Sequence, residues 1–127
     1  MNLLLIHLRF IWLLMLGGVI SGACIGLFFH HSEWLGGYNS FPRRLLRLGP
    51  ISFCGLLFVN EIFVFPSRCP PFPPLAAQIA STALISGSLL MPICCFLTAY
   101  NQRCRFLFSL PTTAVAIAII TVLKFIS

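Results

Sequence analysis

Residues 10–29 read FIWLLMLGGVISGACIGLFF and contain no charged side chain. An α-helix rises about 1.5 Å per residue, so this stretch is about 30 Å long as a helix, which matches the hydrocarbon thickness of a bilayer. The whole chain has the same character, since 59% of its 127 residues are hydrophobic and 8% are charged. Soluble domains carry roughly 25% charged residues. The composition excludes a soluble domain and predicts an all-α membrane protein.

Three more apolar runs follow the first one. We expect four transmembrane helices in a small bundle, within one transmembrane domain that covers residues 1–127, with spans at residues 10–29, 50–65, 75–100 and 106–125. The prolines at positions 70, 71, 73 and 74 exclude a helix between the second and third spans, because proline lacks an amide donor and restricts the residue before it. Pro92 predicts a kink within the third span.

The segment before the second span alternates basic and apolar residues. Arg43, Arg44 and Arg47 are interleaved with leucines at positions 45, 46 and 48. This pattern predicts a short amphipathic interfacial segment, capped by Ser40, with its arginines among lipid headgroups and its leucines in the acyl boundary. We expect Gly49-Pro50 to bend the chain into the second span.

The formal net charge of +6 comes from basic residues that lie at the ends of apolar runs. This placement indicates anchoring to the lipid bilayer and argues against a nucleic-acid partner. The loops after the first and third spans carry five basic residues and the opposite side carries three: Arg43, Arg44, Arg47, Arg103 and Arg105, against Arg9, Arg68 and Lys124. The positive-inside rule then places both termini outside the cytoplasm.

Gly18, Gly22 and Gly26 recur at every fourth position of the first span and form a glycine zipper. Lipid supplies no hydrophobic drive for helix association, so small residues at this spacing favour close approach of a second helix. Both an internal partner helix and a second copy of the chain fit the pattern, and we favour the internal partner.

Glu61 is the most informative single residue, because ionisable groups inside a span are costly and tend to be paired. Chain alternation places Glu61, Asn60, Gln78, Arg9 and Lys124 in the same leaflet. This candidate cluster has two interpretations: a polar vestibule for an ion, proton or headgroup, or a structural ion pair that fixes the helix arrangement. We favour the structural interpretation, because interfacial Arg and Lys often extend to the membrane surface.

The histidines and the six cysteines show no ligand spacing for a metal or a haem. His7 and His30 would lie about 34 Å apart along one helix, too far to share a cofactor. Two acidic residues and three histidines also supply no phosphate loop, paired carboxylates or activated nucleophile. We therefore expect no cofactor, no metal and no enzymatic activity.

Two resemblances add context. The motifs Trp34-Leu35-Gly36-Gly37-Tyr38, Arg43-Arg44, Arg47-Leu48-Gly49 and Ile51-Ser52-Phe53, followed by Asn60, resemble an uncharacterised family of small four-span bacterial inner-membrane proteins. The resemblance covers about a quarter of the chain and implies no function. The family pattern has a His where this chain has Pro50, so a ligand at that position would be lost here.

The second resemblance is to the dual-topology fluoride channels, which are similar in length and span number. It rests on Gly17-Gly18, Val59-Asn60 and Thr112-Thr113. The chain departs from that family because residues 27–29 contain no Arg, and because the Thr pair lies in the fourth span and is followed by Ala114-Val115.

From these features we expect a non-enzymatic accessory or structural subunit of a larger inner-membrane complex, which recognises other membrane subunits or itself. The alternative is a small oligomeric channel or carrier for an ion or solute, with Glu61, Asn60 and Gln78 along its route.

Overall fold

The computed structural model describes residues 3–67 and 72–126. Four long α-helices make up most of them: α1 (Leu3–Phe28), α2 (Phe41–Ser67), α3 (Pro74–Tyr100) and α4 (Ser109–Ile126). Two short 3₁₀ helices, η1 (Trp34–Gly36) and η2 (Gln102–Phe108), lie in the connections. The described residues contain no strand, so the fold is the expected all-α bundle.

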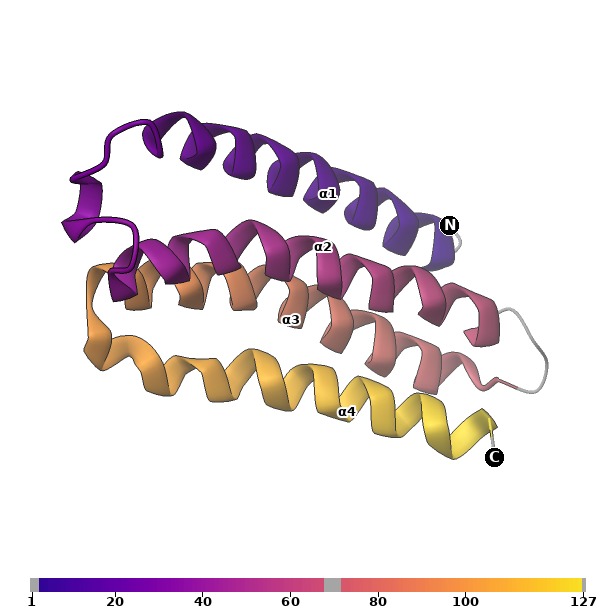
Figure 1. Cartoon of the computed structure of the whole chain (residues 1–127). Helices are drawn as coiled ribbons and strands as arrows, with labels where there is room; N and C mark the ends of the chain where they lie inside the picture. Colours follow the sequence, from indigo (N-terminus) through magenta and orange to yellow (C-terminus); the bar gives the residue numbers. More distant parts are fainter. Residues whose placement is uncertain (1–2, 68–71, 127) are drawn as a thin grey trace.

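The four helices lie side by side in chain order, with α2 and α3 in the middle and α1 and α4 outside them (Figure 1). The main packing partners are α2 with α3, α3 with α4, and α1 with α2. Both chain termini lie at one end of the bundle, and the α1–α2 and α3–α4 connections lie at the other (Figure 1). Two outer helices are therefore packed mainly on one side.

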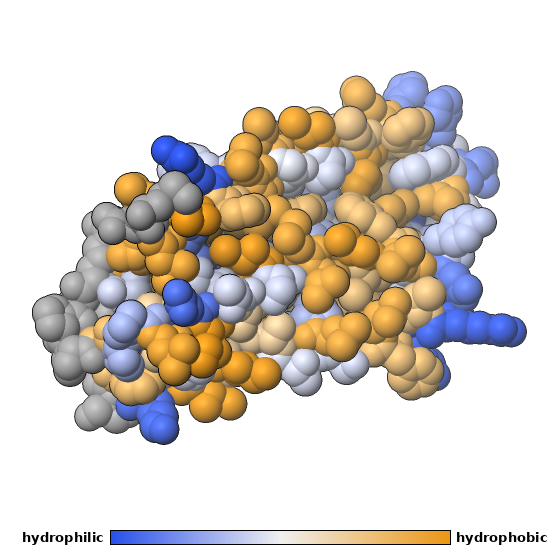
Figure 2. All heavy atoms as spheres, turned by 180° about the vertical axis from the view of Figure 1, so that it is seen from behind, coloured by the Kyte–Doolittle hydropathy of each residue, from blue (hydrophilic) through white to orange (hydrophobic). Residues whose placement is uncertain are grey.

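Each of the four helices is long and apolar enough to cross a membrane. Apolar side chains dominate the middle of the surface seen in Figure 2, whereas the most hydrophilic ones gather toward its two ends. Large hydrophobic side chains such as Trp12, Leu13, Phe58 and Ile120 are more than 60% exposed. Lipid accepts such surface without cost, so the architecture is that of a multi-pass integral membrane protein.

The helix ends differ from those expected in three places. α1 begins at Leu3, because neither His7 nor Arg9 interrupts it, and α4 begins at Ser109 after η2. α2 runs from Phe41 through Gly49 and Pro50 without a break, so the expected separate amphipathic segment forms the first turns of the second span. Proline removes only one backbone hydrogen bond, and packing against α3 holds both halves of the helix together.

Ser40 does not provide the expected side-chain cap at the start of α2. Its carbonyl accepts the Arg44 amide at 3.1 Å, but its buried hydroxyl has no hydrogen-bond partner among the described residues. α3, by contrast, spans almost the expected range and contains Pro92 within its continuous helix.

A glycine allows close approach at each of the three sequential helix interfaces. A Cβ added to Gly18 would lie 3.0 Å from Phe53 of α2. At Gly49 it would lie 2.6 Å from the Phe96 ring of α3, and at Gly87 it would lie 2.6 Å from Val115 of α4. Real Cβ atoms essentially never come as close as 2.6 Å to another atom, and 3.0 Å is tighter than nine in ten real contacts, so a side chain at any of these positions would force its neighbour to shift.

The other two glycines of the expected zipper differ from each other. A Cβ on Gly22 would meet Pro50 of α2 at 3.4 Å, which is ordinary van der Waals contact. A Cβ on Gly26 would have no neighbour within 4 Å. Gly18 and Gly22 therefore face α2, whereas Gly26 is exposed.

Candidate functional site: polar pairs between the helices

Four polar side chains are buried where α1, α2 and α3 meet. They have 2% exposure or less: His7, Asn60, Ser81 and Ser88. Polar groups inside a span need internal partners, because lipid offers none. Their hydrogen bonds therefore identify which helices they connect.

His7 connects α1 to α3. Its Nδ1 lies 2.7 Å from the Ser81 hydroxyl, and the ring packs edge-on against Phe63 of α2 with the centroids 5.3 Å apart. Nδ1 accepts or donates in this bond according to the tautomer, and Nε2 has no hydrogen-bond partner among the described residues. One side chain of α1 thus touches both central helices.

Asn60 connects α2 to α3 through a short chain of hydrogen bonds. Its Nδ2 donates to the Leu56 carbonyl at 2.7 Å and to the Ser88 hydroxyl at 2.8 Å. The Ser88 hydroxyl in turn donates to the Leu84 carbonyl at 2.8 Å. Ser88 therefore both accepts and donates, and the pair fixes the register of α2 against α3.

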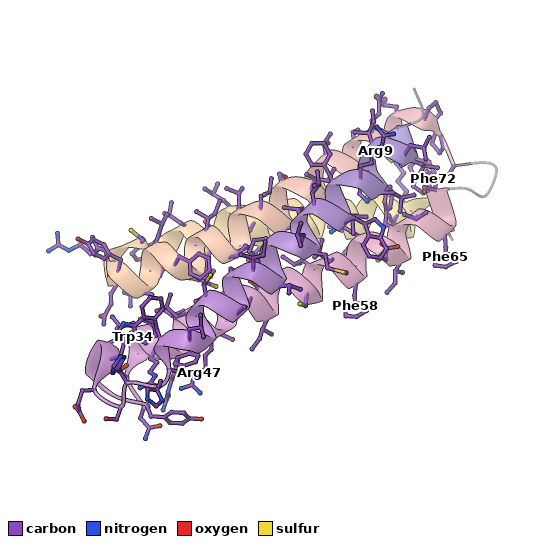
Figure 3. The ribbon with its side chains drawn as sticks, turned by 90° about the horizontal axis from the view of Figure 1, so that it is seen from above. Arg9, Trp34, Arg47, Phe58, Phe65 and Phe72 are labelled. Carbon is purple, nitrogen blue, oxygen red and sulfur yellow. The ribbon has the colours of Figure 1, made fainter. Side chains whose placement is uncertain are left out.

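The structure places the five residues of the expected polar cluster on different faces. Asn60 is buried and Glu61 is half-buried, since successive helical residues point about 100° apart. Arg9, Gln78 and Lys124 are exposed, and each lines a different surface groove. Figure 3 shows Arg9 at the same end of the bundle as Phe65 and Phe72. Of the five residues, Asn60 alone is buried in the interior.

Sequence reasoning considered His7 only as a possible cofactor ligand and did not connect it with Ser81. A signal was present, because His7, Ile11 and Gly18 are four and seven residues apart and so share one helical face, which is the buried face of α1. Ser81 and Ser88 are likewise seven residues apart on the buried face of α3. The helical face that carries Gly18 also carries His7 toward the N-terminus of α1, so the glycine pattern could have predicted a buried His7.

The three expected interfacial arginines have unequal environments. Arg43 is only 3% exposed, and it donates to the carbonyls of Phe29 at 2.9 Å and Ser32 at 3.0 Å. Arg47 is half-buried and donates to the Tyr38 carbonyl at 2.8 Å, whereas Arg44 is exposed. Arg43 thus holds the carbonyl end of α1 in place, where the helix dipole favours a cation.

The grooves of the described surface are mostly apolar. One of about 310 Å³ lies between α2 and α4, and its lining is entirely apolar: Val59, Ile62, Phe63, Phe65, Leu84, Ala118, Ile119, Val122 and Leu123. Within residues 3–67 and 72–126, no group of three His, Cys, Asp or Glu side chains is placed to hold a metal ion. Cys69 and Arg68 lie outside the described residues.

Comparison of the chain with protein-family models, with curated proteins and with solved structures found no match.

Proposed function

We propose that this chain is a non-enzymatic accessory or structural subunit of a larger inner-membrane assembly. The observation that carries the proposal is the contrast between its interior and its outer faces. The interior polar groups Asn60 and Ser88 bond to each other and to the backbone of their own helices. The outer helices α1 and α4, by contrast, are packed mainly on one side.

The closed interior favours a structural role over a conduit. A water-filled route needs polar side chains that are free to bind the passing ion or solute. Here the Asn60 amide is already bonded at 2.7 and 2.8 Å, and His7 Nδ1 is bonded to Ser81 at 2.7 Å. These bonds would have to break before Asn60 Nδ2 or His7 Nδ1 could bind a solute.

The outer faces are where a partner subunit would bind. Leu13 on α1, Phe58 on α2 and Ile120 on α4 are each about two thirds exposed and apolar. A photo-crosslinking phenylalanine analogue at each position, used one at a time in native membranes, tests whether protein covers any of these faces. The proposal expects a discrete protein adduct from at least one position, identified by mass spectrometry. Lipid adducts alone at all three positions would contradict it.

The carrier alternative has a specific observation in its favour, because Glu61 is half-buried beside the interior Asn60. Reconstituted vesicles provide the test, with proton and cation flux measured for the native chain and for Glu61→Gln. Flux that disappears in Glu61→Gln would replace the subunit proposal with the carrier. Equal permeability of both proteins and of empty vesicles supports the subunit.

A further inference from the structure

The junction between α1 and α2 gathers buried hydrogen-bond donors that lack acceptors. Five buried side-chain atoms have no hydrogen-bond partner among the described residues, and three of them lie here: Ser40 Oγ, Arg43 Nε and Arg47 Nε. All three can donate a hydrogen bond. Buried polar groups are almost always paired, so a concentration of unpaired donors indicates an absent acceptor.

The same junction holds two positive charges close together. The Arg43 guanidinium lies 4.9 Å from the Phe29 ring centroid and 5.7 Å from that of Tyr38. The Arg47 guanidinium lies 5.6 and 4.3 Å from the same two rings. Two guanidinium groups that share two aromatic rings repel each other, and an anion between or beside them would offset that repulsion.

The chain supplies no carboxylate at this place among its described contacts. The hydrogen bonds of Arg43 and Arg47 all go to backbone carbonyls, those of Phe29, Ser32 and Tyr38. Glu33, the acidic residue of the connecting loop, is exposed. A negatively charged acceptor from outside the chain would pair with both guanidinium groups.

We propose that this junction binds a phosphate group, carried by a lipid headgroup or by free phosphate. A phosphate accepts several hydrogen bonds at once and pairs with the planar fork of a guanidinium. The first turn of α2, which begins one residue after Ser40, adds the partial positive charge of a helix N-terminus. Arg47 is half-buried and Arg44 and Tyr38 are exposed, so the site faces the molecular surface.

Trp34 provides a built-in reporter of this site. Its ring stacks on Phe28 with the centroids 5.4 Å apart and meets Phe29 edge-on at 5.8 Å, and Phe29 is the ring under both guanidinium groups. Figure 3 shows Trp34 and Arg47 at the same end of the bundle. Trp12 is the other tryptophan, so a Trp12→Phe background leaves Trp34 as the sole source of tryptophan fluorescence.

The experiment titrates the full chain, with Trp12→Phe, in micelles of an uncharged detergent. The probes are phosphatidylglycerol, diacylglycerol without a phosphate, and inorganic phosphate against chloride at equal ionic strength. Arg47→Gln is expected to weaken phosphate-dependent binding about tenfold, the effect of losing one charge-assisted contact. Arg105→Gln is the matched control, because Arg105 lies over Phe106 at 5.1 Å in the other connection at the same end.

Each outcome decides something. A saturable response to phosphatidylglycerol alone identifies a headgroup, and a response to inorganic phosphate as well identifies free phosphate as sufficient. The proposal is overturned if neither probe acts, if diacylglycerol acts equally well, or if Arg47→Gln behaves like Arg105→Gln. If Arg47→Gln loses its helical circular dichroism, Ser40→Ala replaces it, since that change removes an unpartnered hydroxyl and should still weaken binding a few-fold.

Discussion

Replacing Gly87 by alanine should loosen α4 from α3. The added Cβ would lie 2.6 Å from Val115 Cγ2 and 3.4 Å from the Pro111 carbonyl oxygen. Valine has a stiff χ1 and cannot swing its methyl group aside as a long side chain could, so the two helices must separate. The contact lies in the main interface of α4, which packs mostly on α3.

The size of the effect follows from two opposed terms. Extra carbon in a well-packed site typically costs about 1–3 kcal/mol. Alanine gains up to about 1 kcal/mol over glycine in helix propensity. Comparison with Gly55→Ala isolates the steric cost, because a Cβ at Gly55 has no neighbour within 4 Å and the gain in helix propensity is the same in both variants. We expect Gly87→Ala to be less stable than Gly55→Ala by about 1–3 kcal/mol.

The first measurement is thermal unfolding in a mild detergent, monitored by circular dichroism. The second is thiol labelling of Cys94, which is buried between α3 and η2 with its Sγ 3.5 Å from the Leu107 carbonyl oxygen. Gly87→Ala should unfold at lower temperature and label faster. Val115→Ala removes the clashing methyl, so adding it to Gly87→Ala should restore part of the loss. Equal stability of Gly87→Ala and Gly55→Ala, or no rescue by Val115→Ala, would refute the close-approach reasoning.

Three further predictions concern the polar contacts. The first is a double-mutant cycle of Asn60→Leu and Ser88→Ala. The coupling free energy of unfolding should be about 0.6 kcal/mol and at most about 1.7 kcal/mol, the range for interhelical hydrogen bonds in membranes. Additive losses would show that the pair does not hold α2 to α3. His7→Phe keeps a ring at the position and removes the bond to Ser81, so it should cost about 0.5–1.5 kcal/mol in the same unfolding assay; a stabilised variant would argue against the contact. Arg43→Gln removes two charge-assisted bonds to carbonyls, so it should accelerate amide hydrogen exchange in residues 29–40 by at least about tenfold without affecting α4. Unchanged exchange would contradict the role of Arg43 in holding the α1–α2 connection.

The sequence was sufficient to predict the number, order and approximate position of the helices. The third span was expected at residues 75–100 and is found at Pro74–Tyr100, because a long apolar run between a proline-rich segment and a polar loop can form only one kind of element in lipid. The second span was the least accurate. It was expected at residues 50–65, whereas α2 begins at Phe41 and passes through Gly49, which approaches Phe96 of α3.

The direction in which each side chain points around its helix could not be predicted from the sequence. Depth follows from chain alternation, so Arg9, Gln78 and Lys124 could be assigned to one leaflet, but the direction of each side chain around its helix depends on which neighbours that helix packs against. Those neighbours turned Asn60 inward and left Arg9, Gln78 and Lys124 in separate grooves. The same applies to Arg43, whose buried position depends on the end of α1.

The sequence by itself determined that the chain crosses a membrane on four helices, because hydrophobicity and length alone satisfy the demands of the bilayer. Only the tertiary structure decided that His7 meets Ser81, that Asn60 meets Ser88, and that two arginines converge on Phe29. The physical reason is that lipid does not distinguish one apolar helix face from another. Which face of each helix packs against its neighbour is therefore determined by close contacts at a few glycines and by hydrogen bonds between residues far apart in the chain.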